Sequence, residues 1–411
     1  MIGFREGALA NGLKVVAEVN DGAQSVALGV VVDTGARDEP AAISGVSHFL
    51  EHMVFKGSAR LDAEAINLAF DDLGAKYNAF TAEEVTAYHG AVLPERQDDL
   101  LRLLGELMHP SFRPADLDTE RQVIVEEIGM YQDQPESRLF DTLRPAYYGG
   151  HPAGNSVLGT PETLASIDSR GMGAYFRQHY SASTALLVAT GNVNWDALMD
   201  VGEETLGDWP AGGFDRAHPE FTPQATAPLV LTDPGVARAH LGLLAPGWPV
   251  QDPRREDAAL LAAIIGDPEN SRLYWRLVDS GLADTADFGH EPLDRVGAYG
   301  GYASCDPDRA QQVLDGIREV LAGVQAGGVT EAELERAKRK SAMSTVLRAE
   351  TPYGRLLTLG VEYLVSGELL SLAEDVRRIR AVTLDGVNAL LEPRPFDQLK
   401  VAALGPISAL N

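Results

Sequence analysis

The sequence predicts an α+β protein made of two related halves, each a mixed sheet with helices packed on one face. Three observations support this prediction. Strand-like and helix-like patterns occur in both halves of the 411-residue chain. Residues 209–227 are rich in proline and glycine and show no apolar periodicity, which is typical of a linker. The helical segment that begins at Pro114 has a counterpart 217 residues later, at Glu331.

We therefore expect a domain over residues 1–208, a linker over 209–227 and a related domain over 228–411. The length of the chain fits two domains. A second internal match supports the repeat, because the strand pattern that begins at Leu186 recurs at Leu399.

In the first half, alternating and β-branched residues predict strands, and apolar residues at helical spacing predict helices. The expected strands cover residues 13–19 and 26–33 on either side of a polar turn, the pair 74–86 and 88–93, and 185–190. The expected helices cover residues 45–55, 62–73, 95–108, 114–131 and 135–148, with two short helices within 162–180.

The second half repeats this order of elements. Its expected strands lie at residues 229–231 and 239–244, near 287 and 299, and at 399–407. Its expected helices cover residues 254–265, a segment after 271, 306–326 and 330–348.

The segment Gly45–Phe55, GVSHFLEHMVF, carries two histidines four positions apart, His48 and His52. On a helix both imidazoles leave the same face one turn apart, a spacing that suits a divalent metal, zinc first. Glu51 lies on the same side, where its carboxylate can reach a water at the metal, and His-x-x-Glu-His is the inverzincin pattern. Histidines that merely fill the core or lie at the surface are the competing interpretation. The apolar neighbours favour the metal, because buried imidazoles need partners.

Two imidazoles leave a catalytic zinc one protein ligand short. The helix expected over residues 114–131 can supply it, because Glu120 and Glu127 lie two turns apart at the edge of its apolar stripe. Glu126 points to the opposite side. The geometry therefore favours Glu127 or Glu120 over Glu126. The stripe itself consists of Leu117, Ile124, Ile128 and Tyr131.

Charge and cysteine content argue against several classes of protein. The formal net charge of −26 argues against nucleic acid and anionic membranes as partners, and mildly favours neutral or basic ligands. The single Cys305 excludes an intrachain disulfide and a cysteine-based metal site. The sequence has neither a signal-like N-terminus nor a run of eighteen apolar residues, so we expect a cytoplasmic protein that does not enter a membrane.

Six longer stretches between residues 8 and 192 have an order and spacing far more specific than the five-residue motif. They are LANGLKVV, VDTGARDE, GVSHFLEHMVFKG, YNAFTAEEVTAY, ERQVIVEEIGMYQDQP and LFDTLRPAYYGGHPAGNSVLGT. Together they resemble the pitrilysin and insulinase family of inverzincin zinc metallopeptidases, most closely its bacterial members similar to mitochondrial processing peptidase. The resemblance implies two homologous α/β-sandwich domains that form half of a clam-shell chamber.

The resemblance also implies a set of site residues. One Zn2+ per chain would be held by His48, His52 and Glu127. Glu51 would be the general base, and Glu120 an accessory catalytic carboxylate near the metal.

The resemblance further implies how a substrate binds. Asn78, Ala79 and Phe80 match the edge strand on which such enzymes bind an extended peptide. Main-chain hydrogen bonds at a sheet edge accept many sequences, provided that the peptide is unfolded. The implied activity is that of a zinc metalloendopeptidase acting on short or unfolded peptides.

The second half departs from the family. In the active enzymes that the sequence resembles, this half supplies an Arg and a Tyr. Here the Tyr position is Asp284, and the Arg position falls on Val278 or Asp279. One interpretation is a hetero-oligomer, expected to be a heterodimer, in which a related subunit brings the missing pair. The other is that Arg276 or Tyr274 substitutes locally. We favour the hetero-oligomer.

Two rival functions remain. One is a non-catalytic scaffold subunit, like the core subunits of respiratory complexes that resemble processing peptidases. The intact set of His48, Glu51, His52 and Glu127 argues against it, because a scaffold needs none of them. The other is a structural zinc site, which is disfavoured because three protein ligands leave one position open.

Overall fold

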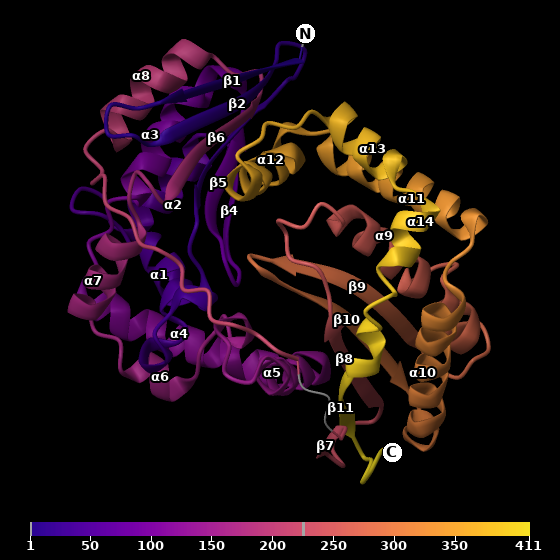
Figure 1. The fold of residues 1–411 in the computed structure, drawn as a ribbon. Coiled ribbons are helices and arrows are strands. Elements are labelled where there is room, and N and C mark those ends of the chain that lie inside the picture. Colours follow the sequence, from indigo (N-terminus) through magenta and orange to yellow (C-terminus); the bar gives the residue numbers. More distant parts are fainter. Residues whose placement is uncertain (1, 224–226) are drawn as a thin grey trace. The chain divides into compact units, whose positions relative to one another are not determined.

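The computed structural model describes residues 2–223 and 227–411. The chain divides into two compact units, and each contains one mixed sheet with helices (Figure 1). Unit 1 comprises the chain up to Ile128, Asn155–Ala217 and Leu347–Leu370. Unit 2 comprises Gly129–Gly154, His218–Val346 and Ser371–Asn411. The predicted α+β class with two sheet-and-helix domains is confirmed, whereas the boundaries at 208 and 228 stay a prediction.

The sheet of unit 1 has six strands in the order β1-β2-β6-β3-β5-β4. All neighbours are antiparallel except β2 and β6, which are parallel. The two strands expected around the polar turn, β2 and β3, are not neighbours, because β6 lies between them. The bounds are β1 (Ile2–Ala8), β2 (Lys14–Asn20), β3 (Val26–Val32), β4 (Lys76–Thr81), β5 (Thr86–Val92) and β6 (Ala185–Gly191).

One face of this sheet is covered by helices from the first half of the chain. Leu28, Val30 and Val32 of β3 point into this core, where Phe49 and Leu50 of α1 pack. The helices are α1 (Val46–Val54), α2 (Ala63–Asp72), α3 (Gln97–Leu107), α4 (Pro114–Gln132), α6 (Pro161–Ala165), α7 (Ser169–His179) and α8 (Trp195–Leu206). Short 3-10 turns precede or join them: η1 (Ala36–Asp38), η2 (Ala41–Ile43) and η3 (Pro94–Arg96). The 3-10 turn η4 (Pro152–Gly154) belongs to unit 2.

The opposite face of the sheet is also covered. There Ala27 and Val31 of β3 meet Leu356 and Leu359 of α12 (Pro352–Ser366), a helix from far along the chain. The prediction of helices on one face only is therefore incomplete. The physical reason is that every residue of β3 is buried, so both of its faces need an apolar cover.

Unit 2 is built in the same way. Its sheet has the order β7-β11-β8-β10-β9, and α5 (Pro135–Tyr148) covers one face by packing Leu139 and Leu143 against Leu244. The strands are β7 (Leu229–Thr232), β8 (Ala239–Pro246), β9 (Thr285–Leu293), β10 (Val296–Cys305) and β11 (Lys400–Gly405). The other helices are α9 (Arg255–Gly266), the π-helix η5 (Tyr274–Val278), η6 (Pro307–Arg309), α10 (Ala310–Gly327), α11 (Glu331–Ala349), α13 (Leu372–Ala381), α14 (Leu384–Ala389) and η7 (Pro395–Gln398).

The internal repeat is visible in two helices of equal length. α4 and α11 each span 19 residues, and they begin at Pro114 and Glu331, which are separated by the predicted offset.

In the described part of the chain, no helix is both long enough and apolar enough to cross a membrane.

The start of α1 is fixed by close packing and by two buried hydrogen bonds. Gly45, the residue before the helix, has φ of +89°, and a Cβ atom there would lie 2.5 Å from the carbonyl oxygen of Leu158. The buried carboxylate of Glu39 accepts hydrogen bonds from the backbone N–H groups of Gly45 (2.6 Å) and Ser47 (2.7 Å). These contacts determine where the helix begins.

We expect Gly45→Ala to lower the free energy of unfolding by about 1–3 kcal/mol, because a positive φ is strained for alanine and the new methyl meets backbone. Gly74→Ala is the matched control, since φ there is +61° and nothing lies within 4 Å of the added Cβ. Urea unfolding midpoints measure both losses. Equal losses in the two variants would show that the contact with Leu158 has no part in the effect.

Candidate metal centre

The helix α1 carries the three polar residues of the motif on the side opposite its most buried apolar residues. Phe49, Leu50 and Met53 are buried in the core, which leaves His48, Glu51 and His52 on the remaining surface of the helix. His48 is 8% exposed, and Glu51 and His52 are half-buried. The ring centroids of the two histidines lie 4.7 Å apart. The local fold therefore brings both imidazoles together, as the spacing predicts.

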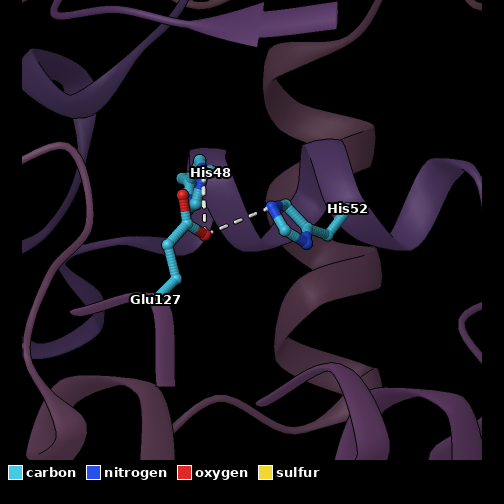
Figure 2. Close-up of side chains that lie close together, drawn as sticks. All are labelled: His48, His52 and Glu127. Atoms are coloured by element: carbon cyan, nitrogen blue, oxygen red, sulfur yellow. Dashed lines mark ion pairs between the residues drawn. The ribbon is translucent and has the colours of Figure 1, made fainter. Parts of the chain in front are cut away.

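The helix α4 brings a carboxylate to these imidazoles. Oε2 of Glu127 lies 3.8 Å from Nε2 of His48 and 3.7 Å from Nε2 of His52 (Figure 2). Ligands about 2.0–2.2 Å from a tetrahedral zinc are separated by about 3.3–3.6 Å, so these separations suit a shared metal. Within residues 2–223 and 227–411, this is the one group of three or more His, Cys, Asp or Glu residues close enough to hold a metal ion.

The chemistry of the donors also fits zinc. His48 is buried, and its Nδ1 has no hydrogen-bond partner within the described part of the chain. Its other ring nitrogen, Nε2, faces the Glu127 carboxylate, so Nε2 is the atom that a metal shared with Glu127 would bind. Burial lowers the pKa of His48 to about 4, which keeps the ring neutral and its lone pair available at neutral pH. Two imidazoles and one carboxylate form the open ligand set of a catalytic zinc site.

Glu120 lies behind His52. Its carboxylate is 5% exposed, is 3.1 Å from Nδ1 of His52 and forms an ion pair with Lys56 at 2.6 Å. A proton on Nδ1 satisfies this contact and leaves the Nε2 lone pair directed at Glu127. Burial by itself lowers the pKa of His52, but the bond to Glu120 and the neighbouring carboxylates outweigh it and raise that pKa.

Lys56 is a residue that the sequence analysis missed. It is four positions after His52, so helical spacing could have pointed to it, although α1 ends at Val54. With Lys56 and His52 on either side, the pKa of Glu120 is lowered despite burial, which acts to raise it. Glu120 is therefore held as an anion that orients the His52 ring.

Glu51 lies close enough to His52 and Glu127 for their charges to act on its carboxyl, but it does not belong to the group of His48, His52 and Glu127. Its Oε2 accepts a hydrogen bond from the Thr81 hydroxyl at 2.7 Å. Burial raises the pKa of Glu51, and the Thr81 bond partly opposes this shift. A carboxylate with a raised pKa next to a metal site is suited to take up and release a proton.

The predicted peptide-binding residues lie on β4, which forms one edge of the unit 1 sheet. Asn78 is exposed and pairs with His89 of β5, Ala79 packs toward the helical core, and Phe80 packs toward α12. The structure thus places all three on an edge strand that contacts α1. Binding of a peptide there stays a prediction.

The positions at which the second half of the chain departs from the family pattern lie in unit 2. Asp284, at the Tyr position, forms an ion pair with Arg238, which also pairs with Asp306. Arg276, one candidate substitute for the missing Arg, forms an ion pair with Glu319 at 2.9 Å. Tyr274, the other candidate, begins the π-helix η5. Both charged residues are engaged within their own unit.

Comparison with known protein families finds two matched regions. Residues 14–161 match the insulinase domain of peptidase family M16, and residues 172–341 match the peptidase M16 inactive domain. Both regions agree with the resemblance found in the sequence.

Individual proteins give similar matches. The uncharacterized zinc protease YmxG of Bacillus subtilis (strain 168) is 33% identical over 400 residues, which cover 96% of this chain and 97% of that protein. The β subunit of mitochondrial-processing peptidase from Caenorhabditis elegans is 26% identical, covering 92% of this chain and 84% of the subunit. The crystal structure of a peptidase M16 inactive domain from Pseudomonas fluorescens matches the fold with a TM-score of 0.92 at 20% identity, covering 100% of this chain and 99% of that one.

The geometry predicts that Glu127, and not its neighbour Glu126, is needed for metal binding. We expect Glu127→Gln to weaken zinc affinity by more than the roughly 10- to 100-fold loss typical of removing a residue that only supports a ligand. Glu126→Gln makes the same chemical change on the exposed side of α4 and should leave affinity unchanged. Zinc content after dialysis against graded chelator, measured by atomic emission, compares the two. Equal zinc retention in both variants would remove Glu127 from the ligand set.

Proposed function

The chain belongs to the insulinase family of peptidases, family M16, and we propose that it is a zinc-dependent endopeptidase that hydrolyses short or unfolded peptides. One observation carries the proposal: the donor atoms of His48, His52 and Glu127 converge, and Glu51 lies next to them. One zinc ion per chain is the metal that this donor set suits best.

Each residue of the site would have a defined role. Zinc bound here would polarise the scissile carbonyl and acidify a water. Glu51 would accept the proton of the attacking water and pass it to the leaving amine. Glu120, the accessory carboxylate, would hold His52 through Nδ1 and would act by positioning this ring. Lys56 would keep Glu120 ionised and in place.

The substrate would lie along β4. An edge strand offers unpaired backbone groups to an extended chain, so it recognises the backbone more than the side chains. Asn78, Ala79 and Phe80 would bind the peptide next to α1. The requirement for an extended backbone explains the preference for short or unfolded peptides.

A related subunit would complete the site. Asp284 offers a negative charge where the family uses a Tyr hydroxyl, so this chain lacks one donor for the transition state. The similarity to a processing-peptidase subunit supports a hetero-oligomer, expected to be a heterodimer, whose second subunit supplies the Arg and Tyr. We place this assembly in the cytoplasm, as the sequence suggests.

The alternative is a non-catalytic scaffold subunit of the same fold. The substitution at Asp284 is the observation that favours it. The arrangement of His48, His52, Glu127 and Glu51 favours the enzyme, because packing alone does not require ligand atoms to converge within 4.8 Å.

Replacing the base tests the proposed chemistry. We expect Glu51→Gln to keep zinc but to lose hydrolysis of a quenched, unstructured peptide mixture by at least about 100-fold, because an amide cannot accept the proton. Glu126→Gln should retain the activity of the unmodified chain.

The same assay separates the three interpretations. Cleavage by the zinc-loaded chain alone, well above the Glu51→Gln blank, would establish a self-sufficient peptidase and refute the need for a partner. No cleavage alone, but cleavage after addition of a related subunit with the Arg and Tyr, would establish the hetero-oligomer. No cleavage in either case, with zinc bound, would establish the scaffold.

Backbone recognition on β4 makes a second prediction. A peptide paired with one strand edge uses the N–H groups of alternate residues. N-methylation scanned along a bound peptide should therefore weaken binding to the zinc-loaded Glu51→Gln variant at every second position. Fluorescence anisotropy of labelled peptides measures this. A loss that does not alternate along the peptide would exclude strand addition.

A further inference from the structure

We propose that Thr81 is a positioning residue that holds the Glu51 carboxylate in its working orientation, an inference that rests on the proposed function of Glu51. Thr81 is the last residue of β4, and its hydroxyl donates a 2.7 Å hydrogen bond to Oε2 of Glu51. No other hydrogen bond to this carboxylate occurs within residues 2–223 and 227–411. Oε1 is thus left available to a water.

The alternation of side chains along β4 determines the face of the sheet on which Thr81 lies. Side chains two residues apart on a strand share a face, so Thr81 lies on the same face as Ala79 and Tyr77. Ala79 and Tyr77 pack against the helical core that contains α1. Thr81 therefore faces α1, whereas Asn78 and Phe80 point to the other side of the sheet.

The backbone beyond Thr81 is firmly held. The N–H groups of Ala36 and Arg37 donate hydrogen bonds to the carbonyl oxygens of Ala82 (3.1 Å) and Glu83 (2.8 Å). Gly35 approaches the Ala82 carbonyl so closely that a Cβ atom would overlap with it. The tip of the β4–β5 hairpin is therefore fixed on the segment around η1.

The same segment also holds the helix that carries Glu51. Glu39, the residue after η1, accepts the two backbone hydrogen bonds at the start of α1. Residues 35–39 thus bind the tip of the β4–β5 hairpin at one end and the start of α1 at the other. The distance between the Thr81 and Glu51 backbones is set by this common anchor, and the hydroxyl meets the carboxylate as a consequence.

This arrangement gives Thr81 a specific task. A glutamate side chain has several rotamers, and general base catalysis requires the carboxylate within hydrogen-bond reach of the attacking water. One fixed donor on Oε2 selects among those rotamers and leaves Oε1 for the proton. The donor belongs to the strand that we propose binds the peptide, so base and substrate are aligned by one element.

Kinetics of three variants test the proposal. We expect Thr81→Val, which keeps the branched shape, to reduce kcat by about 10- to 100-fold, as misplacing a reacting group does. KM and zinc content should change by less than about two-fold, and Thr81→Ser should restore most of kcat because it keeps the hydroxyl. Thr86→Val is the matched control, since Thr86 pairs with Thr81 across the hairpin but donates to the Thr34 carbonyl oxygen.

Several results would overturn the proposal. A kcat of Thr81→Val equal to that of the unmodified enzyme would show that the hydrogen bond has no role. A loss matched by Thr86→Val, or one that appears in KM or zinc content, would show that Thr81 acts only through the fold. Failure of Thr81→Ser to recover activity would have the same meaning.

Crystallography tests the positioning role of Thr81 even if the chain shows no peptidase activity. Crystal structures of the zinc-loaded chain and of zinc-loaded Thr81→Val should show Glu51 in one rotamer in the first, and in a different or divided rotamer in the second. An unchanged, single Glu51 rotamer in Thr81→Val would refute the positioning role. Absence of hydrolysis with the expected rotamer change would instead contradict the proposed function and leave the positioning role supported.

Discussion

The geometry of the candidate metal centre depends on the contact between His52 and Glu120, which connects α1 to α4. Glu120 is almost fully buried, and a buried carboxylate is tolerated only when its oxygens are paired. His52 and Lys56 provide those pairs. Since Glu120 and Glu127 are two turns apart on one helix, fixing the first against His52 brings the second to both imidazoles. The contact of Glu120 with His52 thus determines where Glu127 lies.

A second constraint is the burial of the central strands on both faces. The residues of β3 alternate between the core that contains α1 and the layer formed by α12. In unit 2, β8 and β11 alternate in the same way between the main core and α5. The second face of each sheet is therefore covered by a helix from a distant part of the chain. The helix α12 covers the unit 1 sheet although it follows the unit 2 strand β10 in the sequence, and α5 covers the unit 2 sheet although it follows the unit 1 strand β5. This double cover buries both faces of the unit 1 sheet, which includes β4 and on which α1 packs.

The sequence predicts those features that depend on local spacing. The positions of α1, α4 and β4, and the selection of Glu120 and Glu127 over Glu126, follow from helical or strand periodicity. Other features depend on contacts between distant segments, which one sequence does not reveal. The run VALGVVV of β3 shows that two faces are buried, but it does not show that α12 covers one of them.

The same limit explains the individual residues that were missed or misplaced. Thr81 bonds to Glu51 from 30 positions away, and Glu39 bonds to the backbone of Gly45 from six positions away. Strand alternation gives the face on which Thr81 lies, but no pattern shows which residue either side chain meets. Tyr131 fits the apolar period of α4, yet it is 38% exposed, so the prediction that it belongs to the buried stripe is wrong. It lies at the last turn of the helix, where periodicity continues but the packing partner ends. The candidate metal ligands follow a local pattern in the sequence, whereas the residues that align them do not. A motif therefore locates such a site, and only the packing around it shows which oxygen, ring nitrogen or hydroxyl is held for the reaction.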